Sequence, residues 1–193
     1  MSTRTLFPTL FYEGRIDDET LVADLEYSAL TLAQEDGAGR AWSRANGYRG
    51  YTSYASLDDL PGRDPAFAAL KRRLDKHVAT FARDLQLDLG GRRLRLDSLW
   101  VNVMKRHATH SGHIHPHSVV SGTCYIAVPA GAGALKLEDP RLPMLMAAPL
   151  RPDTFVYAQP ARGAVFLWES WLRHEVMPSD AKDDRISISF NYS

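Results

Sequence analysis

Apolar residues recur with a helical period in the first half of this chain and with a strand-like period in the second half. In the first half they follow steps of three and four over residues 21–32 and again over residues 67–85, which predicts two amphipathic helices. The aspartates at 17–18 are expected to cap the first helix. Asp64 followed by Pro65 marks the start of the second, because proline is favoured at the first helical position.

From residue 92 onward, short apolar or alternating segments are separated by Gly, Pro and Asp, with no helical segment between them. About seven such segments predict a mainly β structure. We therefore expect an α+β fold: residues 92–193 form a double-stranded β-helix (jelly roll) core, and residues 1–91 form a helical N-terminal support. Neither helix can bury its apolar face alone, so residues 1–193 are expected to form a single domain.

The composition fits one soluble globular domain and argues against several partners. The chain has 193 residues and 45% hydrophobic content, and its 23 basic and 23 acidic side chains give a net charge of zero. Zero net charge makes nucleic acid or an anionic membrane improbable as the main partner. A single cysteine, Cys124, together with the lack of a signal-peptide pattern or a long apolar run, predicts a cytoplasmic protein. The oligomeric state is not predicted.

Five of the seven histidines fall between residues 107 and 117, and two of them have the spacing of metal ligands. On a strand, His113 and His115 point the same way, so both imidazoles can bind one metal ion. A histidine-rich surface loop without ligands is the alternative. His117 is expected to support this pair, and the remaining ones are expected to be surface or packing residues: His77, His107 and His110.

A third ligand and an anion-binding residue are predicted near the C-terminus. His174 is the only histidine after the cluster, and Arg185 follows it by eleven residues. Alternation along the last segment places Arg185, Ser187 and Ser189 on one face and apolar residues on the other. A guanidinium binds a carboxylate at two points, and a hydroxyl adds a further hydrogen bond. An exposed strand arginine without a ligand is the alternative.

The order H-x-H, distal histidine, R-x-S on a β-rich core resembles the Fe(II)- and 2-oxoglutarate-dependent oxygenases. The resemblance covers about residues 93–193 and includes the flanking segments 113–126, 132–140 and 160–168. In detail it is similar to a bacterial and phage subgroup with an H-x-H-P-x-S-x-x-S-G signature, here at residues 113–122, and an R-I-S-I-S-F ending.

The resemblance implies a set of site residues and a reaction. The three histidines would bind Fe(II), and Arg185 would bind the distal carboxylate of the cosubstrate 2-oxoglutarate. Ser187 or Tyr125 would assist, and Asn102 would face the cosubstrate, the substrate or the core. The implied reaction uses molecular oxygen to hydroxylate an unidentified small molecule or peptide, with release of succinate and CO₂.

One departure from that family is His115, which stands where most members have Asp or Glu. Three neutral imidazoles leave the full double charge of the metal, which a dianionic cosubstrate would largely balance, and zinc or nickel become alternatives to iron. A histidine that fills this position argues against a halogenase. Glu138, Asp139 and Glu175 are carboxylates that could still join the metal.

Residues 37–61 show no hydrophobic period but are rich in aromatic residues and arginine. We expect a long loop that closes over the substrate, with Trp42, Arg44 and Tyr51 as its contact residues. The alternative is a surface segment whose aromatic side chains pack on the β core. A nucleic-acid stacking surface is disfavoured by the neutral charge.

Two further functions remain open. A cupin-type metalloenzyme that does not use 2-oxoglutarate would share the H-x-H pair. Cupins, however, usually place a glutamate three or four residues later, where this chain has Val119 and Val120. A jelly-roll protein that binds a metal or a sugar without catalysis is the other alternative.

Overall fold

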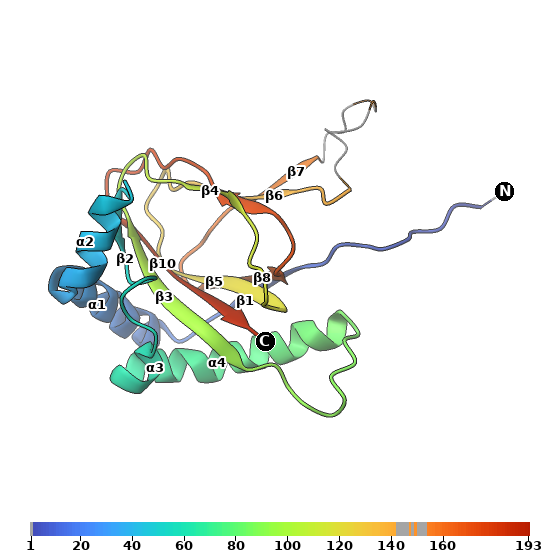
Figure 1. The fold of residues 1–193 in the computed structure, drawn as a ribbon, viewed down its shortest axis with the longest axis horizontal. Coiled ribbons are helices and arrows are strands. Elements are labelled where there is room, and N and C mark those ends of the chain that lie inside the picture. The colour runs from blue at the N-terminus through green and yellow to red at the C-terminus, as the bar shows by residue number, and fades with distance from the viewer. Residues whose placement is uncertain (1, 142–146, 148, 150–153) are drawn as a thin grey trace.

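Two antiparallel β-sheets, formed mainly by the second half of the chain, pack together, and helices cover one face of the larger sheet (Figure 1). The computed structural model describes residues 2–141, 147, 149 and 154–193. The larger sheet has the order β1 (Phe11–Arg15), β8 (Ala164–Glu169), β5 (Val120–Ala127), β10 (Arg185–Tyr192), β3 (Leu96–Met104), β2 (Gly50–Thr52). The smaller sheet has the order β4 (His110–His113), β9 (His174–Val176), β6 (Leu135–Glu138), β7 (Phe155–Ala158).

The two predicted helices are confirmed, together with their capping residues. Helix α1 (Glu19–Glu35) begins after Asp18, whose carboxylate accepts a hydrogen bond from the Leu21 N–H at 3.1 Å. Helix α4 (Pro65–Asp84) begins after Asp64, whose carboxylate accepts from the Ala66 N–H at 2.7 Å. Each cap satisfies a backbone donor that the first turn leaves without an intrahelical partner.

The main hydrophobic core lies between these helices and the larger sheet, and β10 shows why. Ile186, Ile188 and Phe190 on one face of β10 belong to the core that includes the apolar faces of α1 and α4. Ser187 and Arg185 on the opposite face line a cavity between the sheets instead. A second, smaller apolar cluster fills the rest of the space between the two sheets. The predicted alternation on this strand is therefore confirmed.

The expected structureless loop over residues 37–61 is wrong. This segment contains helix α2 (Gly37–Ala45), strand β2 and the start of helix α3 (Leu60–Arg63). Strand β2 exists because it pairs with β3, with Tyr51 opposite Val103. A β-carbon at Gly50 would come within 2.1 Å of the Val103 carbonyl oxygen, so only glycine permits this close approach. Pairing between residues far apart in sequence thus orders a segment that has no local period.

Asp36 joins the end of α1 to α2 and β2. Its carboxylate accepts hydrogen bonds from the Gly39 N–H, the Tyr51 hydroxyl and the Ser56 hydroxyl. Partial burial raises the pKa of this carboxyl, but the hydrogen bonds outweigh that effect and the net pKa is lowered. One side chain therefore fixes the position of the whole segment.

Helix α4 is the longest helix, but no described helix combines the length and apolar character needed to cross a membrane.

Replacement of the Asp36 carboxylate tests whether it holds α1, α2 and β2 together. We expect Asp36→Ala to lower the free energy of unfolding by about 2 kcal/mol or more, because it removes a helix cap and leaves two hydroxyl donors without their acceptor. Chemical denaturation followed by circular dichroism measures the change. Glu35→Ala, at the exposed neighbouring position, is the control. Equal stability of the two variants would contradict this role.

Candidate metal centre

Three histidines come together between the sheets. Two of them lie on strands, and the third lies in the loop after one of these strands. His113 ends β4, His115 follows two residues later, and His174 begins β9 directly opposite His113. Each offers one ring nitrogen, and these atoms all lie within 4.8 Å of one another. The predicted set of ligands is therefore assembled in the fold, including the histidine that lies far from the cluster in sequence.

Hydrogen bonds orient all three rings in the same way. Nδ1 of His113 lies 2.6 Å from the Ser111 carbonyl oxygen, and Nδ1 of His174 lies 2.9 Å from the Leu172 carbonyl oxygen. Nδ1 of His115 lies 2.7 Å from the Asn191 side-chain oxygen. A ring whose Nδ1–H donates to oxygen presents the lone pair of Nε2. Three Nε2 atoms are thus available to one ion, and Nε2 of His115 is buried without a hydrogen-bond partner in the described part of the chain.

Burial favours the neutral form of His174 and His115 by lowering the pKa of each imidazole. It lowers the pKa of His174 to about 3, assisted by the neighbouring histidines, although the Leu172 carbonyl opposes the shift. Burial also lowers the pKa of His115, as does the charge of His113. Only an unprotonated imidazole binds a metal, so the site favours the ligand form of its side chains.

Asn191 holds His115 through a small polar network. Its side-chain oxygen accepts hydrogen bonds from His115 and, at 2.8 Å, from the Ser121 hydroxyl. Its amide nitrogen donates to the Ser98 hydroxyl at 3.0 Å, and Ser121 lies 2.7 Å from the Ser170 hydroxyl. These contacts determine which end of the amide faces the ring, and hence which nitrogen of His115 carries the proton.

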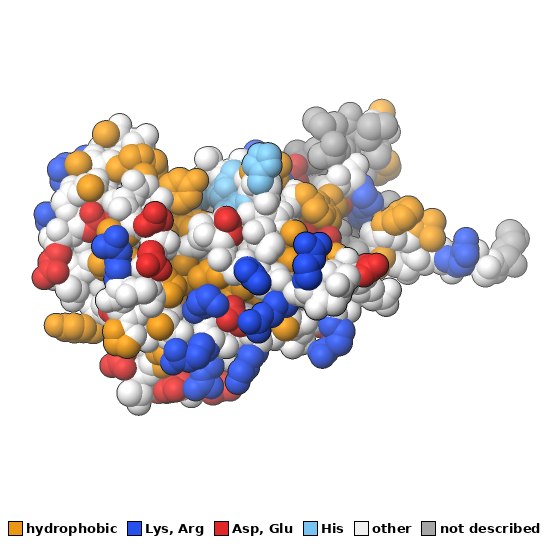
Figure 2. All heavy atoms as spheres, turned by 60° about the horizontal axis from the view of Figure 1, so that its bottom comes forward, with side chains coloured by type: hydrophobic (Ala, Val, Ile, Leu, Met, Phe, Trp, Pro, Cys, Tyr) orange, Lys and Arg blue, Asp and Glu red, His pale blue; other side chains and the backbone are white. Residues whose placement is uncertain are grey.

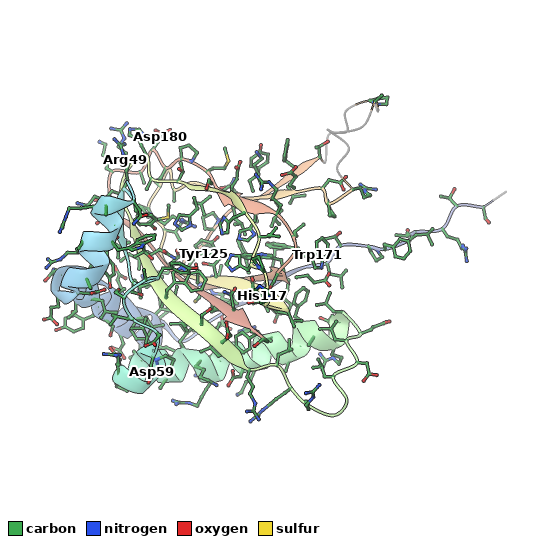
Figure 3. All side chains as sticks on the ribbon, in the orientation of Figure 1. Arg49, Asp59, His117, Tyr125, Trp171 and Asp180 are labelled. Carbon is green, nitrogen blue, oxygen red and sulfur yellow. The ribbon has the colours of Figure 1, made fainter. Side chains whose placement is uncertain are left out.

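A buried polar cavity adjoins the three histidines. In the described residues, four buried side-chain atoms have no hydrogen-bond partner, and all four belong to residues that line this cavity: His115 Nε2, Tyr125 Oη, Trp168 Nε1 and Arg185 Nε. Tyr125 lies in the space between the two sheets (Figure 3). One lone pair and three N–H or O–H donors around one space are suited to a metal ion with an anionic ligand.

Arg185 carries the positive charge of this cavity. Its side chain is 2% exposed, its guanidinium lies 5.0 Å from the centre of the Tyr125 ring, and its Nη1 faces the Met104 sulfur at 2.9 Å. It forms no ion pair with a carboxylate in the described part of the chain. A buried charge without a counterion costs several kcal/mol. The cavity therefore fits a ligand that supplies a carboxylate.

The structure separates the other predicted residues into two groups. Ser187 and Tyr125 line the inner cavity with Arg185, as predicted. Asn102 lines an outer pocket instead, and its amide donates to the Ser189 hydroxyl at 3.1 Å. The three carboxylates considered as further ligands each pair with a basic side chain: Glu138 with Arg173, Asp139 with Arg141 and Glu175 with Lys136.

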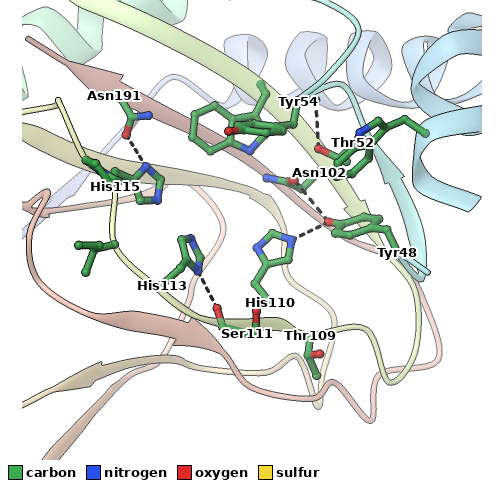
Figure 4. A pocket seen from close by; sticks show the side chains of 14 residues that line it. Tyr48, Thr52, Tyr54, Asn102, Thr109, His110, Ser111, His113, His115 and Asn191 are labelled. Atoms are coloured by element: carbon green, nitrogen blue, oxygen red, sulfur yellow. Dashed lines mark hydrogen bonds between the residues drawn. The ribbon is translucent and has the colours of Figure 1, made fainter. Parts of the chain in front are cut away.

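The outer pocket has a volume of about 440 Å³ and shares His113, His115, His110 and Trp100 with the inner cavity (Figure 4). Histidine side chains reach the surface beside hydrophobic ones on the face shown in Figure 2. Because His113 and His115 line both spaces, the outer pocket opens onto the candidate metal ligands.

The predicted lid residues do not all meet here. Trp42 on α2 lines the outer pocket. Arg44 is exposed, and Tyr51 is a core residue, 4% exposed, whose hydroxyl binds Asp36. His117 is exposed and lies outside the histidine group.

Several residues that line the two spaces escaped prediction. Tyr48 and Tyr54 lie in the aromatic segment before and after β2, and both line the outer pocket. His110, expected to be a surface or packing residue, also lines it, with Nε2 3.0 Å from the Tyr48 hydroxyl. Asn191 could have been found, because it continues the alternation of Arg185, Ser187 and Ser189 along β10.

Sequence comparison agrees with this geometry. A family model described as "Putative 2OG-Fe(II) oxygenase" matches residues 98–191, which contain all three histidines and Arg185. Residues 98–191, which carry the candidate site, therefore match the Fe(II)- and 2-oxoglutarate-dependent oxygenase family. Its cofactors are accordingly Fe(II) and 2-oxoglutarate. No curated protein sequence matches the chain.

Solved structures of this oxygenase superfamily share the fold. A prolyl-4-hydroxylase from Pseudomonas putida superposes with a TM-score of 0.68 at 17% identity, over 95% of this chain and 92% of that one. HygX from Streptomyces hygroscopicus, with nickel and 2-oxoglutarate bound, gives 0.61 at 15% identity over 96% and 82%. The epimerase SnoN, in complex with Fe³⁺, α-ketoglutarate and nogalamycin RO, gives 0.65 at 15% identity over 95% and 78%.

Removal of the Asn191 acceptor should weaken metal binding. We expect Asn191→Leu to lower the affinity for Co(II) or Zn(II) by about 10- to 100-fold, because His115 loses the contact that orients it. Titration calorimetry on the metal-free protein measures this loss. Asn191→Asp keeps an oxygen acceptor of the same size and should retain the affinity. An equal loss of metal affinity in both variants would show that the packing of residue 191, and not its orientation of His115, determines the affinity.

The lowered histidine pKa values predict acid sensitivity of the metal-free protein. Burial, Arg185 and the neighbouring histidines lower the pKa of His110 to about 4. Its pKa in the unfolded chain is about 6.5. Between these values the unfolded state binds more protons, so stability should fall as the pH drops from about 6.5 to 4. Thermal melts across this range should show that His110→Gln loses less stability per pH unit than the unmodified protein does. The difference in slope should be at most about 1.4 kcal/mol per pH unit. An unchanged slope would contradict the assignment.

Proposed function

We propose that this oxygenase is a hydroxylase in which Nε2 of His113, His115 and His174 binds Fe(II) and Arg185 binds 2-oxoglutarate. The observation that carries this proposal is the buried guanidinium of Arg185, which has no carboxylate partner among the described residues and lines the same cavity as the three histidines. One end of a dicarboxylate would neutralise Arg185 while the other end reached the metal. The outer pocket would hold the substrate beside the same metal.

The side chains around the cavity have separate tasks in this proposal. Arg185 and the hydroxyls of Ser187 and Tyr125 bind the distal carboxylate, and Trp168 Nε1 is a further donor in the same wall. Iron with 2-oxoglutarate supplies oxygen activation, in which oxidation of the cosubstrate to succinate and CO₂ accompanies oxygen insertion into a C–H bond. Apolar neighbours exclude water, which strengthens each polar contact.

The three-histidine set agrees with this cosubstrate. Neutral imidazoles leave the metal with two positive charges, and the carboxylate of 2-oxoglutarate that reaches the metal would balance one of them while the distal carboxylate balances Arg185. Relatives in the fold include a prolyl-4-hydroxylase and an epimerase complexed with nogalamycin RO, so both a peptide and a small molecule are reasonable substrates. A cupin that does not use 2-oxoglutarate, or a non-catalytic binding protein, would leave the charge of Arg185 unexplained.

We also propose that the two sheets form a jelly roll and that residues 1–193 act as one unit. Strands adjacent in sequence alternate between the sheets from β3 to β6, which is consistent with this topology. Helices α1 and α4 share a core with β3, β5, β8 and β10, so the N-terminal half supports the sheet that carries Arg185.

Binding of the cosubstrate can be tested without knowledge of the substrate. Anaerobic addition of Fe(II) and 2-oxoglutarate should give a weak visible absorption band, because the cosubstrate chelates the metal. Arg185→Ala should weaken 2-oxoglutarate binding by at least about 100-fold, as expected for loss of a two-point charged contact. Arg63→Ala, an exposed position on α3, is the control. A normal band in Arg185→Ala would refute the assignment.

Metal binding tests the distal histidine. We expect His174→Ala to abolish tight binding of Fe(II), because two ligands from one short segment cannot complete a three-coordinate face. His117→Ala removes an exposed histidine outside the group and should bind metal normally. Elemental analysis after anaerobic loading and gel filtration measures both. Full metal content in His174→Ala would remove this residue from the site.

A further inference from the structure

We propose that the outer pocket selects an uncharged substrate that carries a ring, held by two rows of aromatic side chains that lead to the metal centre. This inference rests on the proposed function, because it assigns the substrate class of the same site.

The first row of rings runs from α2 to a metal ligand. Successive ring centres are 6.2 Å apart from Trp42 to Tyr54, 5.3 Å from Tyr54 to Trp100 and 5.9 Å from Trp100 to His115. Tyr54 is 62% exposed, although its neighbours in the row are more buried. A large aromatic ring left exposed at a pocket mouth offers its face to a ligand.

The second row of rings starts beside β2 and ends at another metal ligand. Ring centres are 5.3 Å apart from Tyr48 to His110 and 6.4 Å from His110 to His113. The two rows meet at the metal ligands, where the rings of His113 and His115 are 5.1 Å apart. Figure 4 shows His113, His110 and Tyr48 in succession, with Tyr54 on the other side of Asn102. A ring placed between the rows would contact apolar faces on both sides.

The lack of charged side chains among the described residues of the pocket lining disfavours both cationic and anionic substrates. None of the described residues that line the outer pocket is Asp, Glu, Lys or Arg. A cation would lack a carboxylate and would lie near the metal and Arg185, which outweighs its attraction to the aromatic faces. An anion would meet ring faces of negative potential and no basic side chain in the described lining of the pocket, and 2-oxoglutarate would already occupy Arg185 and the metal. An uncharged group avoids both costs.

Neutral hydrogen-bonding groups give the pocket its polar side. The Tyr48 hydroxyl lies 3.0 Å from His110 Nε2 and 3.4 Å from the Asn102 side-chain oxygen. Thr52 adds a second hydroxyl, which accepts from the Tyr54 N–H at 3.3 Å and keeps its own proton to donate. These groups match a carbonyl or amide on the ring-bearing substrate.

Four small probes separate charge from shape. Benzamide is an uncharged ring amide, benzoate and benzamidinium are its anionic and cationic analogues, and isobutyramide has the amide without the ring. Ligand-observed NMR titrations use protein loaded with Zn(II) and saturating 2-oxoglutarate, so that no turnover occurs and the inner cavity is filled. We expect benzamide to bind at least tenfold more tightly than each of the other three.

Two variants locate the probe. Tyr54→Ala should weaken benzamide binding at least fivefold, whereas Tyr27→Ala, which removes an exposed tyrosine from α1, should not change it. Equal or tighter binding of either charged probe or of isobutyramide, or an unchanged affinity in Tyr54→Ala, would overturn the inference. Binding of 2-oxoglutarate is measured first. If it fails, the proposed function fails; if it succeeds and benzamide does not bind, only the substrate class is wrong.

Discussion

The two-sided strand β10 is the constraint on which the rest of the structure depends. Its apolar residues, such as Ile188, belong to the core shared with the helices, and its polar residues face the cavity between the sheets. A shift of one residue in register would bury Ser187 among the helices and move Arg185 out of the cavity. Because β10 pairs with both β3 and β5 in the larger sheet, its register also sets where Asn102 and Tyr125 lie. The fold and the site therefore use the same strand.

The candidate site is built around buried polar atoms that have no hydrogen-bond partner within the described part of the chain. A buried guanidinium, a phenol, an indole N–H and an imidazole lone pair would each destabilise the protein without a partner. Their convergence on one cavity explains how this cost is offset, since a metal ion with a dicarboxylate satisfies all of these types of atom. The network around Asn191 has the opposite character, because its groups are satisfied within the protein and hold His115 in one orientation.

The outer pocket depends on a part of the chain that has no local hydrophobic pattern. Helix α2 and strand β2 bring Trp42, Tyr48 and Tyr54 to the outer pocket. Asp36 and the pairing of β2 with β3 hold this segment in place. Of the residues interpreted as a lid, only Trp42 lines the outer pocket, as part of a folded wall rather than a free loop, whereas Tyr51 is a core residue and Arg44 is exposed. A wall held by such contacts presents a preorganised binding surface.

The sequence by itself determined the helices with their capping aspartates and the alternation of β10, and it indicated His113, His115, His174 and Arg185 as candidate groups, which the fold brings to one cavity. These features depend on spacing between residues close in the chain, or on a family pattern. Only the tertiary structure decided the tautomer of His115, the place of His110 and the shape of the outer pocket. The reason is physical: the partners of these side chains, Asn191 for His115 and Tyr48 for His110, lie 76 and 62 residues away in sequence, and no local period records such contacts.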